Sequence, residues 1–235
     1  RGTQQKIAKR PNSCHRSLCR YPLKPVKLLF FFLLSACSLC AKESSDYLKH
    51  KIPLENHRYR TFLRALQLME ERDLRTIVET GTARFGDRYF DSDGGSTIIF
   101  AEWAQDHRAD LFTVDISMTN LAISQSAVER YVSGSRENIH YICSDSIAYL
   151  RKFNQTIDFL YLDSFDYELD NPSPSQLHHL QEIEAAYPFL SKHSIVMIDD
   201  CDLPGGGKGK LAIEFLLQRG WKILHEGYQV ILVTD

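Results

Sequence analysis

The chain has few of the residues that cross-link small secreted domains. Of its six cysteines, only Cys143 and Cys201 lie beyond residue 42, which is too few for a disulfide framework. The other four form two closely spaced pairs, without the second pair of ligands that a zinc site needs. The cysteines therefore indicate neither a disulfide scaffold nor a structural zinc site.

Acidic residues are absent from the start of the chain. Residues 1–42 hold nine of the 28 Lys and Arg and none of the 30 Asp and Glu, so the rest of the chain has 19 basic and 30 acidic residues, a net charge of −11. Nucleic-acid binding depends on a basic face that contacts phosphates. The acidic body therefore argues against nucleic acid as a partner.

No apolar run reaches the roughly 20 residues that a membrane-spanning helix needs. The uncharged run at 28–41 has the length of a signal-peptide core, and Cys37 ends a lipoprotein-like motif, LSAC. We expect a basic leader over 1–43 and a single domain over 44–235. If the leader is used, the protein is exported or tethered to a membrane; otherwise it is cytoplasmic. A buried helix over 28–41 is the alternative.

Two common nucleotide-binding motifs are incomplete. Residues 76–96, TIVETGTARFGDRYFDSDGGS, read as a strand, an acid, a glycine turn and a helix start. Gly81 is not followed by the second glycine of the dinucleotide fingerprint, which weakens a nicotinamide-dependent oxidoreductase as the alternative function. The GGGKGK segment at 205–210 has Pro204 and Leu211 where a P-loop has Gly and Ser or Thr.

Beyond residue 56, apolar strand-like runs alternate with helix-like patterns. Strands are predicted at 76–78, 111–114, 139–143, 157–162, 195–198, 221–225 and 228–233, and helices at 57–73, 97–104, 120–128, 146–153, 173–186 and 211–219. This alternation predicts an α/β fold, Rossmann-like and doubly wound, with helices on both faces of a mostly parallel sheet. The last two strands predict a C-terminal antiparallel hairpin.

Five of the predicted strands end in, or just before, an acidic residue. These residues are Glu79, Asp115, Asp145, Asp163 and Asp199. A single acid at such a position is usually a helix cap or a turn residue. Because the carboxyl ends of parallel strands share one edge, where ligands bind in doubly wound sheets, the five together predict a ligand site.

The segments VETGTARFG, LFTVDIS, CSDSIAYL, DFLYLDSFDYE and VMIDD, in this order, resemble class I S-adenosylmethionine-dependent methyltransferases. The resemblance spans residues 76–235 and implies S-adenosyl-L-methionine as the cofactor. It places Glu79 and the Gly81–Thr82 turn at the cofactor's methionine end. Asp115 would accept hydrogen bonds from the ribose, and Asp145 and Ser146 would lie near the adenine.

The resemblance extends to metal-dependent O-methyltransferases of this class. It implies that Asp163, Asp199 and Asp200 bind Mg²⁺, which prefers oxygen ligands, and that Asp163 is catalytic. Catechol-type members have a lysine three positions after the first Asp, where this chain has Asp166, so no lysine base is expected. In the alternative without metal, Asp163 faces the cofactor or acceptor and Asp199 caps its loop.

Three further segments carry expectations about the site. Successive helix residues point about 100° apart, so His178 and His179 are not expected to face one site, and we predict a solvent-exposed pair. The glycine-rich loop 204–209 is predicted to be a mobile rim over the acceptor. The residues between Gly86 and Gly94 are predicted to form a lid, with Gly95 and Ser96 starting the next helix.

The function that these patterns favour is methyl transfer to an oxygen of a small-molecule acceptor. A non-enzymatic module on the same fold, exported or tethered to a membrane, is the main alternative.

Overall fold

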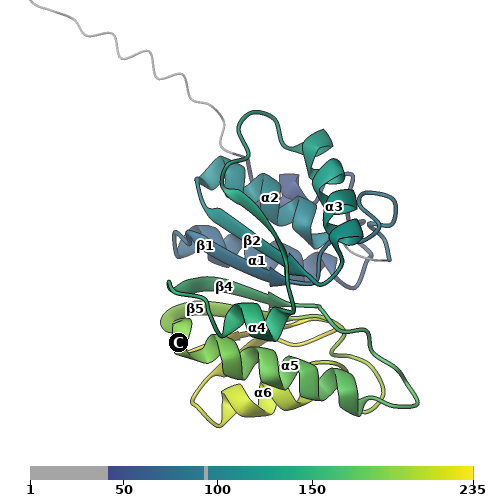
Figure 1. Cartoon of the computed structure of the whole chain (residues 1–235), viewed down its shortest axis with the longest axis vertical. Coiled ribbons are helices and arrows are strands. Elements are labelled where there is room, and N and C mark those ends of the chain that lie inside the picture. Colours follow the sequence, from purple (N-terminus) through teal and green to yellow (C-terminus); the bar gives the residue numbers. More distant parts are fainter. Residues whose placement is uncertain (1–41, 93–94, 235) are drawn as a thin grey trace, which may run out of the picture. The chain divides into compact units, whose positions relative to one another are not determined.

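The computed structural model of the chain describes residues 42–92 and 95–234 (Figure 1). The predicted leader segment 28–41 lies outside these residues, so its role as a signal peptide or tether stays a prediction. Among the helices of the described residues, none combines the length and apolar character that crossing a membrane requires.

The described residues form a seven-stranded sheet in the order β3-β2-β1-β4-β5-β7-β6. The strands are β1 (Thr76–Thr80), β2 (Asp110–Asp115), β3 (Ile139–Cys143), β4 (Ile157–Leu162), β5 (Leu190–Ile198), β6 (Lys222–His225) and β7 (Val230–Val233). β1 to β5 pair in parallel, whereas β7 is antiparallel to both β5 and β6. The predicted mostly parallel sheet with an antiparallel C-terminal pair is confirmed.

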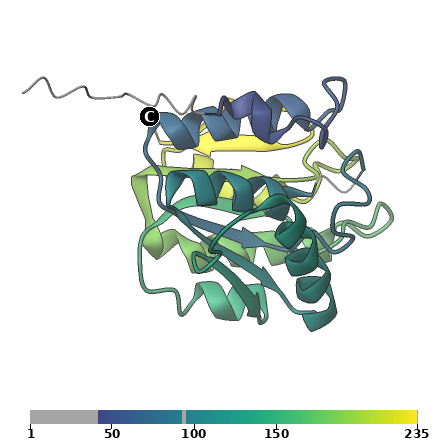
Figure 2. The ribbon, with the colours of Figure 1, turned by 90° about the horizontal axis from the view of Figure 1, so that it is seen from above.

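Helices cover both faces of this sheet (Figures 1 and 2). They are α1 (Tyr59–Glu71), α2 (Ser96–His107), α3 (Met118–Tyr131), α4 (Ser146–Leu150), α5 (Ser173–Ala186) and α6 (Lys210–Leu217), with short 3₁₀ turns η1 (Ser44–Tyr47) and η2 (Tyr187–Phe189). One apolar core joins α1, α2 and α3 to the sheet, and a second joins α4, α5 and α6 to its other face.

The central strands have apolar residues at successive positions, because helices cover both faces of the sheet. In β1, Ile77 enters the core under α1 to α3, and Val78 enters the opposite one. In β4, Phe159 and Leu160 divide in the same way. A period of two therefore sends successive apolar residues of such a strand into opposite cores.

Several predicted bounds differ from the structure. α5 has Pro172 as its N-cap and Ser173 as its first residue, not Ser173 as the cap. β5 begins at Leu190 rather than at residue 195, because its polar first half contains exposed residues and lacks the apolar pattern by which strands are detected. α4 ends at Leu150 rather than at residue 153.

An aromatic cluster fixes α1 and α2 to the sheet. The Phe100 ring of α2 lies 5.7 Å from Phe62 of α1, and 5.2 Å and 5.4 Å from Phe159 and Tyr161 of β4. All four side chains are fully buried. Phe100 is thus the contact common to both helices and to β4, the strand that leads into the predicted site.

Truncating Phe100 tests this packing. Phe100→Ala is expected to lower the free energy of unfolding by about 3–5 kcal/mol, because it removes a buried ring and leaves a cavity. Leu177→Ala on α5, where the side chain is 48% exposed, is the control, with an expected change within about 0.5 kcal/mol. Urea unfolding followed by circular dichroism measures both. Equal effects of the two substitutions would contradict this account of the core.

Candidate active site

The five strand-end acids do lie along one edge of the sheet. Across the sheet their order is Asp145, Asp115, Glu79, Asp163 and Asp199, which follows the strand order β3-β2-β1-β4-β5. Backbone hydrogen bonds continue the ladder past the strand ends: the Asp163 N–H donates to Thr80 O at 3.0 Å, and the Asp199 N–H donates to Leu162 O at 3.1 Å. The predicted shared edge is confirmed.

Gly81 turns the chain at the switch point, where the strand order reverses between β1 and β4. Its φ is +82°, and its N–H donates to Val114 O of β2 at 2.9 Å. A Cβ at this position would lie 2.4 Å from the carbonyl oxygen of Asp163. Only glycine therefore lets the first turn pass this close to the end of β4.

Two adjoining cavities open at this edge. The first, of about 280 Å³, is lined by charged and polar side chains that include Arg58, Asp163, Asp199, Asp200 and Lys208. The second, of about 300 Å³, is lined by Val114, Ser144, Asp145, Ser146, Phe165 and His178. Gly81, Asp115, Ile116 and Ser164 line both. The site is thus a strongly charged cavity joined to a less polar one.

Asp115 lies where the cavities meet, and the protein holds it in one orientation. Its Oδ1 accepts the Ser117 N–H at 2.7 Å and the Asn120 side-chain amide at 3.3 Å. These bonds form a turn between β2 and α3. Asp115 therefore has the turn role common for strand-end acids, and it also faces both cavities.

The predicted adenine-side residues line the second cavity. Asp145 caps α4, with its Oδ1 accepting the Ala148 N–H at 2.8 Å. The Ser146 hydroxyl lies 3.2 Å from His178 Nε2. The structure thus brings Asp145 and Ser146 together with His178 of α5, which sequence reasoning had not placed here. Thr82 lines the first cavity, next to Gly81.

Glu79 is the predicted site residue that does not line either cavity. It is fully buried, and its two oxygens accept the hydroxyls of Ser96 at 2.5 Å and Thr97 at 2.7 Å. These hydroxyls come from the first turn of α2, which begins directly after Gly95 as expected. Glu79 thus joins β1 to the start of α2 beneath the first cavity, where Ser96 forms part of the lining.

The prediction of a solvent-exposed histidine pair is wrong. His179 is fully buried, and His178 lines the second cavity. His178 Nε2 lies 3.4 Å from Glu182 Oε1, and His179 Nε2 lies 3.9 Å from Glu182 Oε2. Both rings reach one carboxylate because Glu182, one helical turn away, lies between their directions. Burial alone would lower the pKa of His178, but Glu182 raises it above its ordinary value.

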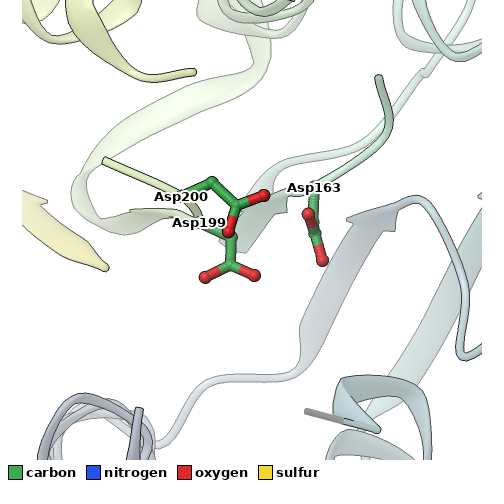
Figure 3. A group of neighbouring side chains, drawn as sticks. All are labelled: Asp163, Asp199 and Asp200. Atoms are coloured by element: carbon green, nitrogen blue, oxygen red, sulfur yellow. The ribbon is translucent and has the colours of Figure 1, made fainter. Parts of the chain in front are cut away.

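Asp163, Asp199 and Asp200 converge from the ends of β4 and β5 (Figure 3). One carboxylate oxygen of each lies within 4.8 Å of the others. Taken alone, this oxygen set suits a hard divalent cation. Asp199 is 1% exposed, so the cluster needs compensating positive charge in any case.

The protein itself supplies that charge through Arg58 and Lys208. Arg58 Nη2 lies 3.1 Å from Asp199 Oδ2 and 3.4 Å from Asp200 Oδ1. Lys208 Nζ lies 2.6 Å from Asp163 Oδ1 and 2.9 Å from Asp200 Oδ2. With the bonds from Arg58 Nε to both Asp199 oxygens, five of the six carboxylate oxygens contact a cation. The cluster as it stands does not fit a bound Mg²⁺.

Sequence reasoning missed both cations. The expected lysine position holds Asp166, so no lysine was assigned to the site. Lys208 instead comes from the glycine-rich loop after β5, where it is 2% exposed. The GGGKGK pattern around Lys208 was the available signal, but the sequence indicated only an incomplete P-loop and a mobile rim over the acceptor.

The glycine-rich loop was expected to be a mobile rim, but hydrogen bonds to α5 hold it in place. The Gln176 side-chain amide of α5 donates to the carbonyl oxygens of Gly205 and Gly207, at 3.1 Å each. Gly207 has φ +60°, and a Cβ there would lie 2.0 Å from Asp200 O. The Lys208 N–H then donates to this same oxygen at 2.9 Å. The loop backbone thus directs Lys208 into the cluster.

Glu79 makes folding stability depend on pH. Burial raises its pKa from 4.5 to about 7, although the Ser96 and Thr97 hydroxyls oppose the shift. Between these values the folded protein holds the proton and the unfolded chain releases it, so stability falls as pH rises. Relative to Glu79→Gln, the wild type should lose about 3 kcal/mol of unfolding free energy from pH 4.5 to 7.5.

Urea titrations of both proteins across this range measure the difference. Glu71→Gln, a change at the exposed end of α1, is the control and should run parallel to the wild type. Parallel curves for the wild type and Glu79→Gln would show that Glu79 does not titrate in this window.

Solved structures with this fold are methyltransferases. NSun6 from Pyrococcus horikoshii with SFG aligns at TM-score 0.56 and 14% identity, covering 72% of this chain and 50% of that one. The SAH-bound methyltransferase PaMTH1 from Podospora anserina aligns at 0.54 and 14% identity, covering 76% and 79%. The O-methyltransferase from Bacillus cereus in complex with SAH aligns at 0.52 and 14% identity, covering 83% and 93%. At these identities the likeness is one of fold.

No curated protein sequence matches the chain. A protein-family profile described as a methyltransferase domain matches residues 92–201. This segment runs from the start of α2 to the acids after β5, and so contains four of the five strand-end acids. The match and the fold both make this chain similar to S-adenosylmethionine-dependent methyltransferases of class I.

Proposed function

We propose that the protein transfers the methyl group of S-adenosylmethionine to an oxygen of a small-molecule acceptor. The observation that carries the proposal is the pair of joined cavities at the switch point. The charged cavity ends at the acids of β4 and β5, and the less polar cavity ends at α4 and α5. A nucleoside with a charged amino-acid arm suits such a pair.

The residues present fit this cofactor. Gly81 lines both cavities and has no side chain, so its backbone can approach the amino-acid arm. Asp115, at the junction, offers carboxylate oxygens to the ribose hydroxyls. Asp145, Ser146 and Phe165 line the cavity assigned to the adenine. When bound, the cofactor supplies an activated methyl group on a sulfonium, so orientation in the site contributes most of the rate.

Asp163 is the carboxylate proposed to take the proton from the acceptor hydroxyl. It lines the charged cavity. The three clustered carboxylates face only two cations, which leaves one negative charge unmatched. Burial raises the pKa of Asp163 well above its usual range, although Lys208 opposes this shift. Only Oδ1 of Asp163 contacts a cation among the described residues, so Oδ2 is available to take a proton from an acceptor hydroxyl in the cavity.

A small molecule is favoured over RNA as the acceptor. The chain from residue 43 onward has a net charge of −11, and the charged cavity contains three Asp side chains of the cluster, together with Asp115 and Asp166. An acidic entrance repels a phosphate backbone. The likeness to the Bacillus cereus O-methyltransferase, which covers 93% of that chain, also supports transfer to oxygen.

Calorimetric titration with S-adenosylmethionine tests the cofactor site. The full chain should bind, and Asp115→Ala should weaken binding at least tenfold, because two ribose hydrogen bonds of about 1 kcal/mol each are lost. Asp110→Ala, at the opposite end of the same strand, is the matched control and should bind like the wild type. Absence of binding, or equal binding by Asp115→Ala, would refute the proposed cofactor site.

Methyl transfer from labelled cofactor identifies the acceptor class. Label is expected in a panel of hydroxylated small molecules and not in total RNA. Asp163→Asn should lower kcat by about 10²-fold or more, since the proton acceptor is lost, while cofactor affinity stays within about threefold, a difference of less than 1 kcal/mol. Label in RNA would overturn the acceptor assignment, and a fully active Asp163→Asn would remove Asp163 as the base.

A further inference from the structure

We infer that Lys208 is the resident cation of the Asp163–Asp199–Asp200 cluster and takes the place of the divalent ion that the resemblance to metal-dependent O-methyltransferases implied. The inference rests on the proposed function for the identity of the site as the methyl-transfer site. It adds that this chain needs no metal there. The inference is based on Lys208 of the glycine-rich loop and Arg58 just before α1, neither of which lies at a strand end.

The contact distances leave little room for a second cation. Lys208 Nζ lies 2.6 Å from Asp163 Oδ1 and 2.9 Å from Asp200 Oδ2. Mg²⁺ binds carboxylate oxygen at about 2.1 Å, so an ion on the Asp163 oxygen would be within roughly 4.7 Å of the ammonium. A divalent ion would therefore have to displace Lys208 or bind against a like charge.

Displacing Lys208 would disturb a fastened loop. The ammonium is delivered by backbone contacts: the Lys208 N–H donates to Asp200 O, and Gly207 packs too closely to this oxygen for any side chain. Gln176 and Tyr167 hold the neighbouring carbonyl oxygens of Gly205, Gly207 and Pro204. Lys208 is thus positioned by the fold rather than by free rotation of an exposed side chain.

Arg58 occupies the other side of the cluster. Its Nε reaches both oxygens of Asp199, at 3.3 Å and 3.2 Å. Its own position is set by Ser92 O, which accepts from Nη1 at 2.9 Å, and by the Tyr228 ring, whose centroid is 4.5 Å from Cζ. With both cations in place the cluster has a charge of −1, whereas adding a divalent ion would make it +1.

The lysine is charged in this setting. Its Nζ lies within 2.9 Å of carboxylate oxygens from both Asp163 and Asp200, which compensate the positive charge of the ammonium. The ammonium also lines the charged cavity beside Arg58. It can therefore attract the oxygen of an acceptor directly, and the acceptor need not present two adjacent oxygens to chelate an ion.

Titration with Mn²⁺, followed by electron paramagnetic resonance on the full chain, tests the inference. The wild type should bind no Mn²⁺ up to about 1 mM, because the ion would have to displace the Lys208 ammonium or lie beside a like charge. Lys208→Met should bind Mn²⁺ at least tenfold more tightly than the wild type. Lys210→Met, two residues further on at the exposed first position of α6, is the matched control and should behave like the wild type.

Two results would overturn the inference. One is wild-type binding of Mn²⁺ at micromolar concentration that is lost in Asp163→Asn; this measurement remains decisive even if Lys208→Met fails to fold. The other is a folded Lys208→Met that gains no Mn²⁺ affinity, since Lys208 would then not be standing in for an ion. A parallel calorimetric titration with S-adenosylmethionine keeps the two proposals apart, because loss of cofactor binding tests the methyltransferase site and not the metal.

Discussion

The structure of the site depends on placing three carboxylates at the ends of two neighbouring strands without leaving their charge uncompensated. Asp199 is almost completely buried, and an unpaired charge in such a position is strongly destabilising. Arg58 and Lys208 make the arrangement possible. They come from the segment before α1 and the loop after β5, so the ion pairs also hold these two segments against the carboxyl edge of the sheet.

The close contact between β1 and β4 is the second constraint. Because Gly81 lies against the backbone of Asp163, the turn after β1 and the end of β4 form one backbone contact at the switch point. Glu79 supports the same turn from below, through the Ser96 and Thr97 hydroxyls at the start of α2. The two cavities thus share a rigid wall.

The strand-end acids show how one residue type serves both fold and function. Asp145 caps α4 and Asp115 stabilises the turn into α3, and both also line cavities. Their structural hydrogen bonds fix the carboxylates at the walls of these cavities. By contrast, both carboxylate oxygens of Glu79 accept hydroxyl hydrogen bonds, from Ser96 and Thr97. Glu79 therefore stabilises the packing of β1 against the start of α2. The position of an acid at a strand end does not tell whether it caps a helix or turn or lines a ligand cavity. Asp115 and Asp145 do both.

Local patterns in the sequence determined the alternation of strands and helices, the parallel sheet and the acids along its edge, because periodicity and strand ends depend on near neighbours in the chain. Tertiary structure alone decided which charges meet. Arg58 and Asp199 are 141 residues apart, and Lys208 is 45 residues from Asp163, so no local pattern records these pairs. For the same reason, the burial of His179 became visible only once α5 was packed against the sheet, whereas its approach to Glu182 follows from their i,i+3 spacing within α5.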